Sequence, residues 1–175
     1  MKNAIGKRIM IIGSCGAGKS ILATQLSRII NIPVFHLDKE YWKPGWVKPE
    51  KEEWHEKQKA LVDNEYWIID GNYNGSLDLR FSRADTVILL DYNRFICLFR
   101  IFKRWLQNYG KNRIDMGEGC KEKRPDLEFI KFVWDFPKKS RPKIIEKINE
   151  NNRIKSILLK NGKQLRNFMK ELEEH

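Results

Sequence analysis

Short hydrophobic runs alternate along the chain with longer stretches in which apolar residues recur every three or four positions. Such runs are typical of buried strands, and the longer stretches are typical of helices that cover a sheet. The run 86–91 is apolar almost throughout, as expected when both faces of a strand are covered. We therefore predict an α/β fold with a five-stranded parallel sheet and right-handed helical crossovers. The predicted strands are 8–12, 33–38, 66–70, 86–91 and 156–160, and the predicted helices are 19–30, 49–63, 78–82, 95–109, 126–134, 142–149 and 163–173.

One segment interrupts this alternation. Residues 110–124 are strongly polar, contain three glycines and show no periodicity, which is typical of a mobile loop or lid. The chain shows no internal repeat, no low-complexity segment and no long linker. We therefore predict a single domain over residues 1–175, with a lid at 110–124.

A glycine-rich segment connects the first predicted strand to the first predicted helix and fits the pattern G-x-x-x-x-G-K-[ST]. Its glycines allow backbone N–H groups to point at phosphate oxygens, and the helix N-terminus adds a partial positive charge. Lys19 is expected to reach the β- and γ-phosphates, and the Ser20 hydroxyl is expected to ligate Mg²⁺. The segment predicts binding of Mg·ATP. This phosphate-binding loop consists of Gly13, Ser14, Cys15, Gly16, Ala17, Gly18, Lys19 and Ser20.

Other motifs separate the classes of phosphate-loop protein. The guanine-binding motif N-K-x-D is absent and no D-x-x-G follows the third predicted strand, so a GTPase is disfavoured. Motor and AAA-type ATPases are longer chains. The remaining class is the small kinases, which need a second carboxylate near Mg²⁺, an acceptor pocket and basic residues around the transferred phosphoryl group.

Two aspartates are expected at the carboxyl ends of strands, where ligands of open α/β sheets bind. We interpret Asp70 as a Mg²⁺ ligand acting through water, and the alternative is a residue of a strand-end turn. We interpret Asp38 as a general base or an acceptor-orienting group, and the alternative is a helix cap. His36 is interpreted as a packing residue.

Arginines follow in the basic second half of the chain. Arg100 and Arg104 are neighbours on one face of a predicted helix, Arg113 lies in the lid, and Arg141 follows it. Planar guanidinium groups suit phosphate oxygens, although a surface arginine is most often only solvated. We expect at least two of these residues to contact phosphate. The predicted catalytic residues are Lys19, Asp38, Arg104, Arg113 and Arg141.

Five aromatic residues follow the second and third predicted strands. Such side chains either wall an acceptor pocket and stack on a base, or pack in the core, and the sequence leaves both interpretations open. They are Tyr41, Trp42, Trp46, Trp54 and Tyr73.

Charge and cysteine content limit the binding partners and the cellular compartment that we expect for the protein. The net charge is +11, and residues 93–175 hold 21 Lys/Arg against 11 Asp/Glu, which favours a polyanion such as a nucleotide or nucleic acid, or simply a solvated basic surface. Three widely spaced cysteines argue against a disulfide framework, and no zinc-binding pattern occurs. Without a signal peptide or an apolar run of ~18 residues, we expect a cytoplasmic protein with no membrane association.

Several stretches together resemble one family. The most specific are W-K-P-G-W at 42–46 and I-I-D-G-N-Y at 68–73, and further matches are at 13–20, 36–38, 77–80, 83–86, 103–104, 115–120, 136–137 and 141–143. These stretches span most of residues 8–145, and the chain resembles the adenylate-kinase-related phosphate-loop proteins known as DNA topology modulation proteins. The resemblance implies an adenylate-kinase-like fold with a core, an acceptor side and a lid.

The chain departs from adenylate kinases after the third predicted strand. Asn72-Tyr73 stands where they carry F-P-R, so the arginine that grips an AMP phosphate is missing there, and Arg80 or Arg83 is the possible replacement. This makes AMP a doubtful acceptor. The sequence predicts transfer of the ATP γ-phosphoryl group to a small molecule, nucleoside or nucleotide. The alternative is an ATP-dependent regulatory or DNA-binding protein. The base of ATP is expected near Asn161-Gly162, and the chain is expected to be a monomer or a dimer.

Overall fold

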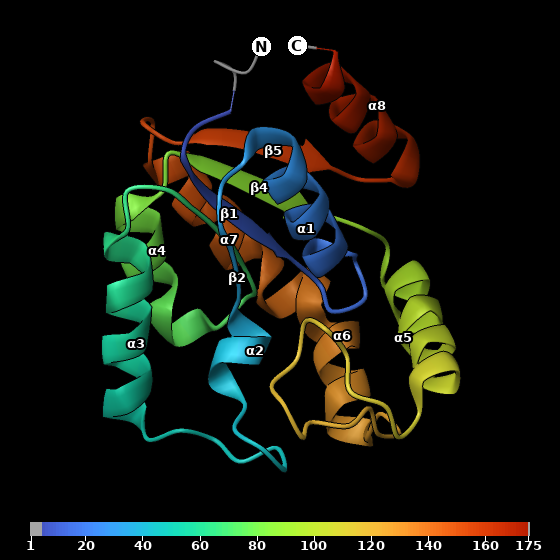
Figure 1. Cartoon of the computed structure of the whole chain (residues 1–175). Coiled ribbons are helices and arrows are strands. Elements are labelled where there is room, and N and C mark those ends of the chain that lie inside the picture. Colours follow the sequence, from blue (N-terminus) through green and yellow to red (C-terminus); the bar gives the residue numbers. More distant parts are fainter. Residues whose placement is uncertain (1–4, 175) are drawn as a thin grey trace.

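The computed structural model describes residues 5–174, which form one α/β sandwich with a central sheet (Figure 1). All strand pairs are parallel, and the strand order is β2-β3-β1-β4-β5. This confirms the predicted five-stranded sheet. The strands are β1 (Arg8–Gly13), β2 (Val34–His36), β3 (Trp67–Asp70), β4 (Thr86–Leu90) and β5 (Lys155–Leu159).

Helices connect the strands and cover both sheet faces (Figure 1). None of the helices in residues 5–174 is long and apolar enough to cross a lipid bilayer. The helices are α1 (Lys19–Ile30), α2 (Leu37–Tyr41), α3 (Lys51–Asp63), the 3₁₀ turn η2 (Asn74–Ser76), α4 (Leu77–Arg83), α5 (Arg94–Asn108), α6 (Leu127–Lys139), α7 (Arg141–Glu150) and α8 (Gly162–Glu173).

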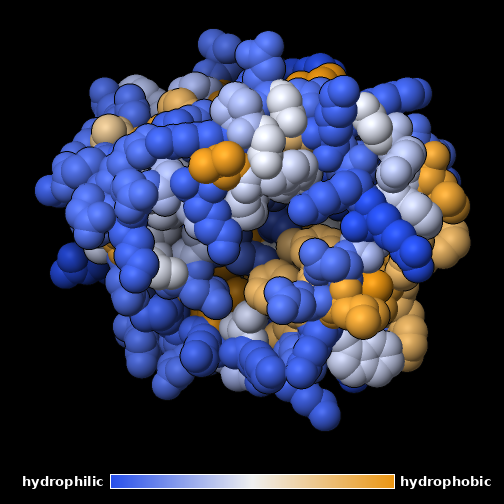
Figure 2. Space-filling view, turned by 90° about the horizontal axis from the view of Figure 1, so that it is seen from below, coloured by the Kyte–Doolittle hydropathy of each residue, from blue (hydrophilic) through white to orange (hydrophobic). Residues whose placement is uncertain are grey.

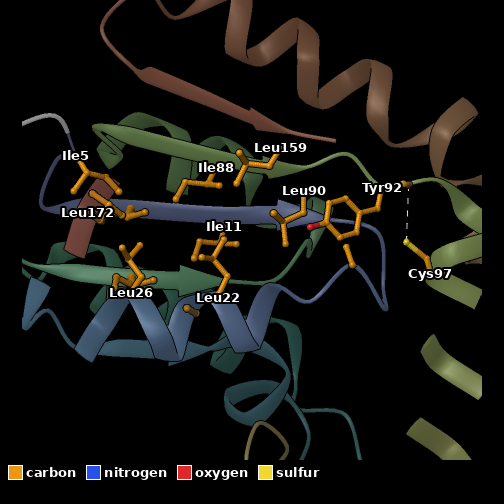
Figure 3. Packing of buried hydrophobic residues seen from close by; sticks show 14 of the residues in the cluster. Ile5, Ile11, Leu22, Leu26, Ile88, Leu90, Tyr92, Cys97, Leu159 and Leu172 are labelled. Atoms are coloured by element: carbon orange, nitrogen blue, oxygen red, sulfur yellow. Dashed lines mark hydrogen bonds between the residues drawn. The ribbon is translucent and has the colours of Figure 1, made fainter. Parts of the chain in front are cut away.

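The central strand β1 divides the core into two layers because its successive side chains point to opposite faces. Ile9 and Ile11 belong to a cluster with residues of α1, α5 and α8. Met10 and Ile12 belong to a second cluster with residues of α3, α4 and α7. In the first layer, Leu22 of α1 points toward Ile11 (Figure 3). Helices therefore pack on both faces of the sheet, and the loops at its carboxyl edge extend from this packed core.

The second strand is shorter than the sequence predicts. β2 ends at His36, and Asp38 lies in the first turn of the short helix α2 rather than at a strand end. The prediction of Asp38 as a strand-end residue was therefore wrong. Leu37 is fully buried in the second core layer although it is already the first residue of α2, so the apolar run continues past the end of the strand. A carboxylate is also favoured in the first turn of a helix by the helix dipole.

The predicted lid segment 110–124 contains no helix or strand, but it is tied down by backbone hydrogen bonds. The Gly110 amide donates to the Glu122 carbonyl, and the Glu122 amide donates to the Lys111 carbonyl. The segment also reaches the loop after α2, where the Trp46 indole donates to the Lys121 carbonyl at 3.1 Å. The lid segment thus lies across the end of the molecule that carries α2.

Candidate functional site

The phosphate-binding loop follows β1 at the carboxyl edge of the sheet. Gly13, Gly16 and Gly18 all have positive φ angles of 147°, 79° and 99°, a backbone conformation that residues with a side chain rarely adopt. A Cβ atom at Gly16 would collide with the backbone carbonyl of Cys97 in α5. These positions therefore require glycine for two reasons, the backbone conformation of the loop and its close contact with α5.

Lys19 is the first residue of α1, and its side chain folds back over the loop. Its Nζ atom donates to the carbonyl oxygens of Gly13 and Ser14, both at 3.1 Å. The positive end of the α1 dipole lies at the same place. Two sources of positive charge therefore meet inside the loop, as phosphate binding requires.

Ser20 and Asp70 come together as the sequence predicts for a metal pair. The Ser20 hydroxyl donates to Oδ2 of Asp70 at 2.8 Å. Both are the hard oxygen ligands that Mg²⁺ prefers, and Mg²⁺ keeps several of its own waters, so two protein oxygens fit such a site. Within residues 5–174, no group of three or more His, Cys, Asp or Glu side chains is arranged to hold a metal by itself.

His36 contacts the other oxygen of Asp70. Its Nδ1 atom lies 2.5 Å from Oδ1 of Asp70, because the parallel register pairs His36 of β2 directly with Asp70 of β3. Burial would lower the pKa of His36, but the hydrogen bond and negative charge of Asp70 outweigh it and raise the pKa. His36 thus orients the predicted metal ligand, a role beyond the packing that the sequence suggested.

Asp38 lies in the first turn of α2 and contacts the loop after β3. Its Oδ1 accepts a hydrogen bond from the Tyr73 hydroxyl at 3.0 Å. Burial raises the pKa of Asp38, and the positive charge of Lys19 acts in the opposite direction. Burial also raises the pKa of Tyr73, so Tyr73 stays protonated and donates. Asp38 is therefore a carboxylate within electrostatic reach of Lys19 that is held in place by one neutral donor.

Arg104 and Arg113 converge on Glu122, a buried carboxylate of the lid segment. Arg104 Nε donates to Glu122 Oε1 at 3.0 Å, and Arg113 Nη1 donates to Oε2 at 2.7 Å. Arg113 also binds Asp115 through two hydrogen bonds of 2.9 and 3.0 Å. Burial raises the pKa of Cys15 in the phosphate-binding loop, and the positive charges of Lys19, Arg104 and Arg113 act in the opposite direction. Contact of Arg104 and Arg113 with phosphate stays a prediction.

Arg100 and Arg141 have other partners. Arg100 Nη1 donates to the Ala17 carbonyl at 3.1 Å, at the back of the loop. Arg141 forms two hydrogen bonds of 2.8 and 2.9 Å with Asp91, directly after β4. Contact of Arg141 with phosphate stays a prediction. A shallow depression of about 480 Å³ lies here, between the ends of β4 and β5, and it is lined by Asp91, Tyr92, Asn93, Arg94, Pro137, Arg141 and Lys160.

The five aromatic residues form one cluster beside Asp38. The Tyr73 ring centroid lies 4.8 Å from Tyr41 and 5.2 Å from Trp54, and the Trp42 centroid lies 5.4 Å from Trp46. All five rings are partly buried. Seen from this end of the molecule, the surface is hollowed near its middle (Figure 2). The rings therefore pack against one another, and their role as walls of an acceptor pocket stays a prediction.

The two arginines of α4 differ sharply. Arg80 is fully buried, and its guanidinium donates to the carbonyl oxygens of Gly71, Asn72 and Tyr73 at 2.8, 2.5 and 3.0 Å. Burial lowers its pKa to about 9. Arg83 forms an exposed pair with Asp63. Arg80 holds the loop that carries Tyr73 through its two Nη atoms, which donate to backbone carbonyls rather than to an acceptor phosphate, and its Nε is buried without a partner.

We expect Arg80→Met to destabilise the fold by about 2–4 kcal/mol, because three buried carbonyls lose their donor. The matched variant Arg83→Met removes an exposed ion pair and is expected to cost about 0–1 kcal/mol. Urea unfolding of both variants measures the difference. Equal losses of stability would show that Arg80 does not hold the 71–73 loop.

Three residues of the site were missed or undervalued from the sequence. Glu122 was not singled out, because a glutamate in an aperiodic loop carries no signal of its own. Tyr73 was noted only as an aromatic, and its hydroxyl contact with Asp38 depends on how the loop after β3 turns. The contact of His36 with Asp70 follows from pairing of β2 with β3, and the matching positions of both residues at strand ends could have indicated it.

Comparison with solved structures places this geometry in a known fold. A shikimate kinase from Acinetobacter baumannii in complex with shikimate aligns with a TM-score of 0.61 at 13% identity, covering 95% of this chain and 90% of that one. A shikimate kinase from Bacteroides thetaiotaomicron gives 0.57 at 17% identity, covering 96% of both chains. A gluconokinase from Sinorhizobium meliloti 1021 gives 0.54 at 10% identity, covering 96% and 90%.

The fold is that of the phosphate-loop kinases. At these identities the likeness concerns the fold alone. No protein-family model and no curated protein sequence matches the chain. The sequence-based resemblance to DNA topology modulation proteins therefore stays a prediction.

Proposed function

We propose that the chain is a kinase that transfers the γ-phosphoryl group of Mg·ATP to a hydroxyl group of a small molecule. The observation that carries this proposal is the buried Asp38 carboxylate, whose Oδ1 is held by the Tyr73 hydroxyl at 3.0 Å. The positive charge of Lys19 in the phosphate-binding loop acts to lower the pKa of this carboxyl, which supports a proton acceptor beside the loop.

Each residue has a distinct role in the proposed reaction. Lys19 and the loop amides hold the β- and γ-phosphates, and Asp38 accepts the proton of the acceptor hydroxyl as the oxygen attacks phosphorus. Ser20 and Asp70 would hold Mg²⁺, which neutralises phosphate charge when bound. Arg104 and Arg113 would stabilise the transferred group after exchanging Glu122 for phosphate oxygens.

We propose further that the acceptor is uncharged and carries a flat ring. The aromatic cluster adjoins Asp38, and aromatic rings favour stacked or edge contacts with other rings. Two lysines beside this cluster are paired, Lys43 with Glu53 and Lys57 with Glu40, and Lys123 lies over the Trp46 ring, 5.1 Å from its centroid. Shikimate and gluconate, named for the similar structures, are carboxylates, and both Nη atoms of Arg80 are bonded to backbone carbonyls. A nucleoside meets these requirements.

The test is a transfer assay with γ-labelled ATP, Mg²⁺ and a panel of acceptors. Nucleosides, shikimate, gluconate and nucleoside monophosphates are each incubated with the wild type and with Asp38→Asn. We expect a labelled product from a nucleoside, with a strong loss in the variant. Label transfer to none of these compounds, with duplex DNA binding that weakens steeply with salt, would instead support the DNA-binding alternative.

Asp70→Asn is expected to weaken Mg²⁺-dependent ATP binding about 10-fold or more, because a neutral amide is a poorer ligand for Mg²⁺ than a carboxylate. Isothermal titration with ATP in Mg²⁺ and in EDTA separates this effect from nucleotide binding itself. The exposed Asp63→Asn serves as the control. An equal loss for Asp70→Asn in EDTA would contradict a metal role.

A further inference from the structure

Helix α5 carries a row of large apolar side chains that point into solvent. The row is Phe95, Phe99, Phe102, Leu106 and Tyr109, the last at the helix end, with exposed fractions of 63%, 68%, 38%, 72% and 67%. The hydrophobic surface gathers along this edge of the molecule (Figure 2). Burying such side chains is worth roughly 1.5–3 kcal/mol each, so their exposure needs an explanation.

The spacing of the row is regular. Its residues are separated alternately by four and three positions, which is the repeat of two helices that pack along their length. Cys97 and Ile101, on the other side of α5, are buried in the core. Helix α5 lies at the periphery of the fold (Figure 1). Helix α5 therefore has two apolar sides, one packed in the core and the other facing solvent.

Two arginines of α5 are turned away from this row, and a third lies over Trp134 at its edge. Arg100 bonds to the Ala17 carbonyl, Arg104 to Glu122, and Arg94 to the Trp134 carbonyl. A helix that binds an anionic lipid surface instead directs its cations outward beside the apolar face. The exposed row thus has few charges at its flanks, Lys103 and the Arg94 guanidinium over the Trp134 ring, which suits another apolar helix better than a lipid headgroup layer.

We propose that a second copy of this chain covers the row, with α5 packed antiparallel against α5 about a twofold axis near Phe102. A twofold contact brings the same patch of both copies together, so a self-complementary row is what it requires. The opposed helix dipoles of an antiparallel pair also attract. This pairing is independent of the proposed reaction.

The available area is adequate for such a dimer. Five side chains of this size, about 60% exposed on average, present about 600 Å² per copy. Trp134 and Leu127, which lie seven residues apart on α6 with exposed fractions of 42% and 84%, widen the patch, since Trp134 contacts Phe95 edge-on. The total approaches the roughly 800 Å² per partner of a standard interface.

The test is the mass of the full chain in solution by light scattering at micromolar concentration. We expect the wild type to have twice the 20.9 kDa of one chain, and Phe99→Glu with Leu106→Glu to have the mass of a monomer. The control is Ile21→Glu on α1, whose side chain is 67% exposed, and it is expected to remain dimeric. Circular dichroism shows that the variants stay folded.

Cysteine cross-linking then tests the arrangement. Phe102→Cys is expected to form a disulfide-linked dimer under mild oxidation, whereas Phe95→Cys is not, because its two copies would lie about 20 Å apart in an antiparallel pair. Cys97 and Cys120 are buried, and the wild type under the same oxidation measures the background from the partly buried Cys15. A monomeric wild type, or a monomer that binds phosphatidylserine vesicles through α5, would overturn the proposal.

Discussion

Lys19→Ala is expected to lower phosphoryl transfer about 10³-fold or more and to weaken ATP binding. The Nζ atom is the positive charge at the centre of the phosphate-binding loop, and preorganised charges of this kind supply a large share of transition-state stabilisation. Titration calorimetry with Mg·ATP measures the binding loss, and release of labelled phosphate measures the slow reaction with water even without an acceptor.

The control for this variant is Lys59→Ala, an exposed lysine on α3 whose contact is with Glu56 on the same helix. It leaves the phosphate-binding loop unchanged, so ATP binding should equal that of the wild type. If Lys19→Ala bound Mg·ATP as tightly as the wild type, the loop would not be a nucleotide site.

The second large effect is expected for Asp38→Asn, with kcat lowered about 10²–10⁴-fold and the KM for ATP nearly unchanged. The amide has the size of the carboxylate but cannot accept the proton of the acceptor hydroxyl. The measurement uses the acceptor found in the transfer assay. Unchanged kcat in this variant would remove Asp38 from the base role and leave it as a positioning group.

The pH dependence gives an independent check of the base. Burial raises the pKa of Asp38 above the ~3.9 of an exposed aspartate, and a base works only when deprotonated. Activity should therefore fall as the pH drops through this raised pKa, earlier than for an exposed carboxylate. The Tyr73 hydrogen bond lowers the pKa, so Tyr73→Phe should move the acidic limb to still higher pH.

The sequence predicted the sheet and the phosphate-binding loop because both are local patterns. The first predicted strand differs from β1 (Arg8–Gly13) by one residue, and the first predicted helix matches α1 (Lys19–Ile30). The end of β2 was missed because Leu37 prolongs an apolar run, although it becomes the first residue of a helix. In a short apolar run, the sequence does not distinguish a buried strand from the first turn of a buried helix.

The partners of the charged residues were beyond local patterns. Glu122 binds Arg113 and Arg104 across 9 and 18 positions of chain, and the intervening loop has no periodicity that fixes its path. The burial of Arg80 could have been inferred, since it lies three positions after buried Leu77 and therefore on the same face of α4. The three-residue spacing from Leu77 therefore indicated in the sequence that Arg80 faces the core, although its charge alone suggests an exposed side chain.

Helix α5 touches the phosphate-binding loop with one side, at Gly16 and through the hydrogen bond from Arg100 to Ala17. Its opposite side carries the row proposed to join two subunits. A nucleotide that moves the phosphate-binding loop would also move helix α5, and with it the apolar row on the outer side of that helix. Thermodynamic linkage then works in both directions, so that whatever factor ATP adds to subunit affinity, pairing adds to ATP affinity. In such a dimer the two sites would be coupled through the α5 pair, so that ATP binding at one site would change the affinity of the other site for ATP.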